Sequence, residues 1–174
     1  MNRNRIARSS LRNVALLALM AALALPDAAD AQLVSTPLEP GVYTYLREIV
    51  DRSPDRYSLT LVSSRLLRLQ TVHSNALTVV EYVADNQVLI SGVIARAGAL
   101  DAGTRERIDR RISDYNIGAA VGTLRLDEES GEITLEHRVN PRLVGPACIA
   151  RVIMLVSEAI ARQQIGLAEL IASS

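Results

Sequence analysis

Residues 77–95 read LTVVEYVADNQVLISGVIA, two runs rich in β-branched residues on either side of the short connection Ala84–Asn86. Val, Ile and Tyr fit the pleated surface of a strand, and a polar connection of two or three residues is typical of a β-hairpin. The sequence therefore predicts two antiparallel strands, 77–83 and 88–95, in the middle of the chain.

Further strands are expected on both sides of this hairpin. Apolar and polar residues alternate in four more short segments, which is typical of strands with one buried face. The segments are 57–61 and 67–71, with a turn at Ser63–Ser64, and 123–126 and 133–139, with a polar turn at 127–131.

Three helices frame these strands in the sequence. Helical spacing of apolar residues predicts helices over 41–52, from 102 to about 115, and from Pro146 onward. Asp101 is a suitable N-cap for the second helix, and Gly118 and Gly166 are expected to end the second and third. The order α-β-β-β-β-α-β-β-α predicts an α+β fold, an antiparallel sheet of about five to six strands with helices packed on one face.

The N-terminus has the three parts of a secretory signal peptide. Four Arg precede an apolar run over 14–25, and Ala29 and Ala31 supply the small residues that signal peptidase requires. A run of this length is shorter than the roughly 20 residues of a membrane-spanning helix. We expect cleavage after Ala31 and a periplasmic or secreted bacterial protein without a stable membrane anchor.

The expected domains are a signal peptide (1–31), an irregular leader (32–40) and one α+β domain (41–174). Residues 32–174 keep 15 of the 19 basic and 17 of the 19 acidic residues, and Lys is absent. This slightly acidic balance gives no electrostatic reason to expect nucleic acid as a partner.

Cys148 is the only cysteine, so the chain cannot form an internal disulfide. It lies in the apolar run 147–156, which favours a buried and inert thiol. A disulfide to a second copy and a reactive thiol are the alternatives.

The second half of the chain resembles the YbjN-type family, whose domain shares the fold of type III secretion chaperones. The resemblance lies in Asp114-Tyr115-Asn116, in 122–127 (GTLRLD) and in 131–135 (GEITL), followed by a long closing helix. It implies a non-enzymatic binding or regulatory module that is often dimeric, and it identifies no client.

Residue patterns for chemistry are sparse. His73 and His137 fall on different predicted strands, and the spacing of Glu81 and Asp85 from His73 fits no metal motif. The serines at Ser63–Ser64 and Ser91 lack the Gly-x-Ser-x-Gly elbow of a hydrolase. We predict no catalytic, cofactor-binding or metal-binding residue and no cofactor.

One basic cluster, Arg107, Arg110 and Arg111, could hold an anion or an acidic partner. Glu106 and Asp109 lie beside it, which favours a solvated helix face with intrahelical ion pairs, including Glu106 with Arg110.

The sequence as a whole predicts an exported, non-enzymatic protein-binding module, chaperone-like, with an unknown protein client. A homodimer is a further candidate assembly. The first helix, which carries Tyr residues, and the broad apolar face of the last helix are the expected interaction surfaces. The alternatives are a small hydrolase or ligand-binding enzyme of the cell envelope, and a purely structural envelope protein.

Overall fold

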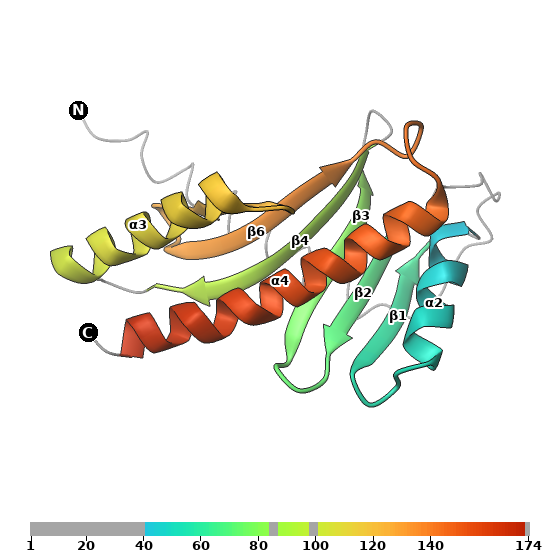
Figure 1. The fold of residues 1–174 in the computed structure, drawn as a ribbon, viewed down its shortest axis with the longest axis horizontal. Helices are drawn as coiled ribbons and strands as arrows, with labels where there is room; N and C mark the ends of the chain where they lie inside the picture. Colours follow the sequence, from blue (N-terminus) through green and yellow to red (C-terminus); the bar gives the residue numbers. More distant parts are fainter. Residues whose placement is uncertain (1–40, 84–86, 98–100, 173–174) are drawn as a thin grey trace, which may run out of the picture. The chain divides into compact units, whose positions relative to one another are not determined.

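The computed structural model describes residues 41–83, 87–97 and 101–172, which all belong to one compact unit, Ser35–Ser174. Figure 1 shows how the helices and strands of these residues are arranged. In chain order they are α2 (Tyr43–Asp51), β1 (Tyr57–Ser63), β2 (Leu66–Thr71), β3 (Ala76–Val83), β4 (Gln87–Arg96), α3 (Ala102–Gly118), β5 (Thr123–Leu126), β6 (Glu132–Val139) and α4 (Pro146–Ala172).

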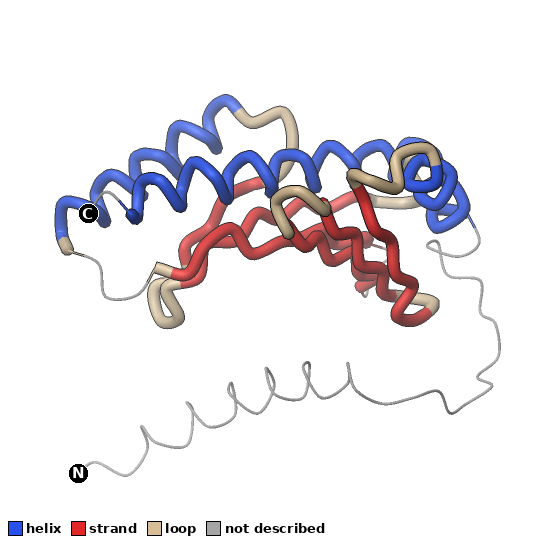
Figure 2. The backbone as a smooth tube through the Cα atoms, turned by 90° about the horizontal axis from the view of Figure 1, so that it is seen from below, coloured by secondary structure: helices blue, strands red, loops and turns tan. Residues whose placement is uncertain are grey.

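The strands form one six-stranded antiparallel sheet in the order β1-β2-β3-β4-β6-β5. Figure 2 shows the described helices together on one face of this sheet. Helix α4 lies across the sheet, α2 packs beside its N-terminal half, and α3 packs beside its C-terminal half (Figure 1). The predicted α+β fold and its element order are confirmed.

Strand alternation selects the side chains that form the core. Leu67, Leu69, Val80 and Ile90 are fully buried, whereas their neighbours in sequence point to the other face of the sheet. Helix α4 covers these residues with Ile149, Ile153, Val156 and Ile160, among others. The core is therefore a single layer of aliphatic side chains between α4 and the sheet.

Strands β3 and β4 pair over only part of their length. Register pairing joins Val79–Val83 to Gln87–Ser91, whereas β3 begins at Ala76 and β4 continues to Arg96. At Gly92 a Cβ atom would lie 2.5 Å from Cδ1 of Ile160 and 2.8 Å from the carbonyl oxygen of Leu77. The missing side chain thus lets α4 sit close to β4 where the ladder ends.

Helix α3 begins as the sequence predicts. The Asp101 side chain accepts a hydrogen bond from the backbone N–H of Thr104 at 3.0 Å, which satisfies a free donor of the first turn. The Glu106–Arg110 pair forms at 2.9 Å, and the helix ends at Gly118. Only Thr104 and Ile108 of α3 are buried, so most of its surface faces solvent.

The prediction that Gly166 ends the last helix is wrong, because α4 continues to Ala172. A Cβ atom at Gly166 would lie 3.1 Å from Nη2 of Arg111, which reaches over from α3 and bonds Gln163 at 3.1 Å. The glycine thus leaves room for the Arg111 side chain and does not stop α4, and burial of Leu167 beyond it stabilises the last turns.

The predicted signal peptide, the leader and the Ala84–Asn86 connection lie outside the described residues. Among the helices that the structure does describe, none combines the length and apolar character needed to cross a bilayer.

Candidate protein-binding surfaces

The prediction of a buried Cys148 is wrong, because this side chain is exposed. The apolar run 147–156 is helical, so only part of it faces the sheet; Ile149, Ala150 and Ile153 are buried there. Leu155, in the same apolar run, is 49% exposed on the outer side of the helix. Most of the broad apolar face of α4 is therefore buried in the core, and only a narrower outer surface of the helix is exposed.

Helix α2 presents a smaller surface than its composition suggests. Leu46 and Val50 are buried against the core, and Tyr43 packs partly against it. Tyr45 is 43% exposed and is the aromatic ring that α2 offers to solvent most openly. A single partly exposed Tyr is a weak candidate for a binding surface on its own.

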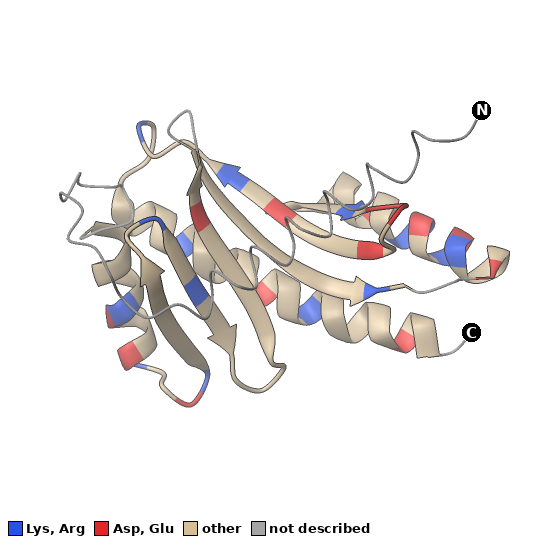
Figure 3. Cartoon of the chain, turned by 180° about the vertical axis from the view of Figure 1, so that it is seen from behind, with Lys and Arg blue, Asp and Glu red and all other residues tan. Residues whose placement is uncertain are grey.

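The other candidate is the sheet face opposite the helices. No described helix covers this face (Figure 2), and Figure 3 shows both basic and acidic residues on its strands. The register aligns Arg68, Val79, Ser91, Glu136 and Thr123 across five neighbouring strands. We call this surface the open face.

An open hollow of about 450 Å³ lies on this face where β3 and β4 cease to pair. Leu77 and Val93, which are 41% and 39% exposed, supply apolar surface at its rim, and Val79 and Ala95 extend that surface. Gln164 of α4 donates from Nε2 to the carbonyl oxygen of Val93 at 2.9 Å. We call this hollow the β3–β4 groove.

Charged and hydroxyl groups from β4 and β6 border the β3–β4 groove. Arg96 and Glu132 form an ion pair at 3.3 Å, and Ser91, Thr134 and Glu136 also line the hollow. Apolar side chains next to hydrogen-bonding groups are typical of a surface that recognises a peptide or a small molecule. Sequence reasoning missed this groove, because β3 and β4 carry apolar residues on both faces and periodicity cannot show which face stays uncovered.

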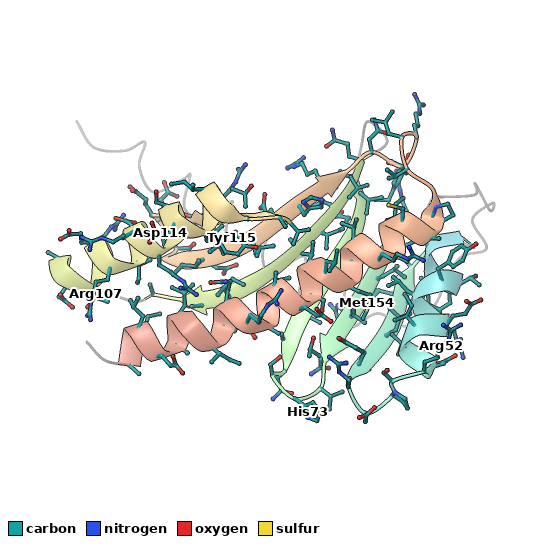
Figure 4. All side chains as sticks on the ribbon, in the orientation of Figure 1. Arg52, His73, Arg107, Asp114, Tyr115 and Met154 are labelled. Atoms are coloured by element: carbon teal, nitrogen blue, oxygen red, sulfur yellow. The ribbon has the colours of Figure 1, made fainter. Side chains whose placement is uncertain are left out.

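A second hollow of about 360 Å³ separates the end of α3 from α4. Tyr115 lines it and donates its hydroxyl to the carbonyl oxygen of Val121 at 2.7 Å. Burial raises the pKa of Tyr115 above its usual value. Figure 4 shows Tyr115 and Asp114 together on α3. The Tyr115 hydroxyl is engaged in holding the chain after α3, so this hollow is a weaker candidate.

The residues that carry the family resemblance have structural tasks. Asn116 accepts the Leu124 N–H at 2.8 Å and donates to the Leu124 carbonyl at 3.0 Å, which fixes β5 to the end of α3. Gly122 has a positive φ of 73° and donates its N–H to Nδ1 of His137 at 3.0 Å. These residues therefore position the β5–β6 hairpin.

The two histidines occupy separate parts of the molecule. His73 is exposed in the turn between β2 and β3 (Figure 4), whereas His137 is half-buried in β6, where burial lowers its pKa. Glu81 lies toward the far end of β3 from His73, and Asp85 lies outside the described residues. Among the described residues, no group of three or more His, Cys, Asp or Glu could hold a metal ion.

The other candidates for chemistry are equally dispersed. Ser91 lies inside β4 on the open face, whereas the pattern of burial places His137 on the opposite face of β6. In the Arg cluster of α3, Arg110 bonds Glu106, Arg111 bonds Gln163, and Arg107 bonds Thr104. The interpretation as a solvated helix face therefore accounts for this cluster.

No protein-family model matches the chain, and no curated protein matches it, so membership of the YbjN-type family stays a prediction. A chain of the HopA1–SchA chaperone–effector complex aligns at 14% identity and a TM-score of 0.47, covering 74% of this chain and 94% of that one. A chain of the ExoT–SpcS complex from Pseudomonas aeruginosa aligns at 17% identity and a TM-score of 0.38, covering 76% and 98%.

Proposed function

We propose that this chain is an exported, non-enzymatic module that binds a segment of a client protein on the open face of its sheet. The observation that carries the proposal is the β3–β4 groove, where exposed Leu77 and Val93 gather around a hollow on a face that no described helix covers. Exposed apolar patches rimmed by polar residues mark sites of protein–protein interaction or ligand-binding grooves.

The groove supports a peptide rather than a compact ligand. It is open and lies along two strands, so an extended segment can cross it with one apolar side chain between Leu77 and Val93. Ser91 and Thr134 offer hydroxyl groups, and Glu136 offers a carboxylate. This chemistry fits a client segment with an apolar residue flanked by polar or basic residues.

Site-specific photocrosslinking in cells that export the protein tests this site. A photoreactive phenylalanine analogue at position 77 or 93 should give a discrete covalent adduct with a client, identified by mass spectrometry. The matched control places the analogue at Ile117, which is 84% exposed at the end of α3. Absence of adducts from positions 77 and 93, or the same adducts from position 117, would contradict the proposed site.

Export is the other part of the proposal, and it is supported by the signal-peptide pattern of residues 1–31. Replacing Ala29 and Ala31 with bulky residues should block cleavage, because the peptidase accepts only small side chains there. The measurement is the mass of the protein recovered from the periplasm. Normal processing of the double variant would refute cleavage after Ala31.

A further inference from the structure

The outer side of α4 carries a regular stripe that the core does not use. Successive positions are spaced alternately by four and three residues, which keeps them on one side of a helix and is the spacing of a coiled-coil seam. The stripe, which we call the outer stripe, consists of Arg151, Leu155, Glu158, Arg162, Ile165 and Glu169.

The outer stripe is accessible along most of its length. Leu155 and Ile165 are 49% and 58% exposed, although both are large aliphatic residues. Arg151, Arg162 and Glu169 are exposed, and Glu158 is half-buried because it accepts a hydrogen bond from the Tyr57 hydroxyl at 3.1 Å. Two apolar residues thus lie between charges on a surface about 27 Å long, at 1.5 Å per residue.

The charges and apolar residues of the stripe are arranged symmetrically about Ile160. Glu158 and Arg162 lie two residues from it, Leu155 and Ile165 five, and Arg151 and Glu169 nine. Each position on one side is therefore matched at the same distance on the other side by an opposite charge or by a second aliphatic residue.

We infer that a second copy of this chain packs its α4 antiparallel on the outer stripe, with the two-fold axis crossing the stripe midway between Glu158 and Arg162, at the level of Ile160. In that register Arg151 faces Glu169 of the other copy, Glu158 faces its Arg162, and Leu155 faces its Ile165. The two-fold symmetry repeats each pair, as an isologous interface requires. These are the layers of an antiparallel coiled coil, in which facing seam positions alternate.

The pattern also selects against the other arrangement of the same two helices. In a parallel pair every position would face its own copy, so arginines would oppose arginines and glutamates would oppose glutamates. Like charges placed opposite each other disfavour association strongly. The self-complementarity of the stripe therefore fits a second copy better than an unrelated protein, and it leaves the open face free for a client.

This register places Cys148 outside the dimer contact. Cys148 lies twelve residues from Ile160, so the two Cys148 side chains would be separated by about 36 Å along the helices. A disulfide needs Cα atoms within about 7 Å. The inferred dimer therefore does not contain a Cys148–Cys148 bond.

A charge swap tests the inference, because Arg151 and Glu169 are too far apart to interact within one chain. Sedimentation velocity of the purified full chain gives its dissociation constant. Each single variant, Arg151→Glu or Glu169→Arg, should weaken the dimer about tenfold or more by creating two like-charge pairs. The double variant should restore the dimer, and Arg142→Glu, an exposed loop charge outside the stripe, should leave it unchanged.

Circular dichroism spectra identical to the parent's establish that the variants fold. A parent chain that stays monomeric at high micromolar concentration overturns the inference, and so does a dimer that the single reversals leave intact or the double variant fails to restore.

Disulfide trapping tests the register separately. In a Cys148→Ser background, Leu155→Cys together with Ile165→Cys should form a covalent dimer under mild oxidation. Leu155→Cys alone should form none, because its two copies lie about 15 Å apart. Covalent dimers from that single variant, or from native Cys148, contradict the register. The inference goes beyond client binding, since a monomer that still gives the adducts at positions 77 and 93 would refute only the dimer.

Discussion

The two faces of the sheet are built from the same strands and differ in what covers them. On the helix face, Leu67, Leu69, Ile90 and Leu135 are fully buried under α4 and its neighbours. On the open face, their neighbours in sequence remain partly or fully exposed, and apolar residues there gather at the β3–β4 groove. The buried apolar contacts that stabilise the fold are therefore concentrated on one face, and no described helix covers the other.

The largest expected effect comes from removing a side chain of the helix face. Leu135→Ala should lower the free energy of unfolding by about 2–5 kcal/mol, because it leaves a cavity in a fully buried site. Thr134→Ala, the next position and on the open face, should cost less than about 1 kcal/mol. Urea denaturation followed by circular dichroism measures the free energy of unfolding of both variants. Equal losses would contradict the conclusion that only the helix face holds the core.

Removing the hydrogen bonds between Asn116 of α3 and the edge strand β5 should lower the free energy of unfolding by a smaller amount. Asn116→Ala removes both hydrogen bonds to the Leu124 backbone and should cost about 1 kcal/mol. Hydrogen exchange should show faster exchange of the Leu124 amide, whereas the core strands keep their protection. An unchanged Leu124 exchange rate would mean that water replaces the side chain without loss.

A third expectation concerns the groove itself. Leu77→Thr with Val93→Thr places a β-branched residue at both strand positions, so the stability should change by less than about 1 kcal/mol. The same double variant should lose client capture in the photocrosslinking assay, with the analogue moved to Val79 at the groove wall. If the double variant still captures the client and its stability is unchanged, the groove is not the client-binding site.

The smallest effect is a pH dependence from His137. Burial lowers its pKa in the folded state, so the unfolded chain binds the proton more readily and the stability falls as the pH drops below about 6.5. His137→Gln should flatten the stability profile between about pH 7 and pH 5. His73→Gln, a change in an exposed turn, is the matched control and should retain the slope of the parent.

Local patterns were sufficient for most of the fold. Alternation predicted β1, β2, β5 and β6, and runs of β-branched residues predicted β3 and β4. The Asp101 cap and Gly118 marked the ends of α3, and Pro146 marked the start of α4. Gly166 was misread because a glycine can end a helix or let another element approach it, and only the position of Arg111 distinguishes the two. Cys148 was misread because an apolar run contains both faces of a helix.

The sequence by itself determined the α+β order, the aliphatic core and the symmetric charges of α4, because these follow from residue type and spacing along one chain. Only the tertiary structure decided which face of the sheet the helices cover and where β3 and β4 stop pairing. Strands with apolar residues on both sides can pack either way, and the choice is made by contacts between segments far apart in sequence. The β3–β4 groove is a product of that choice.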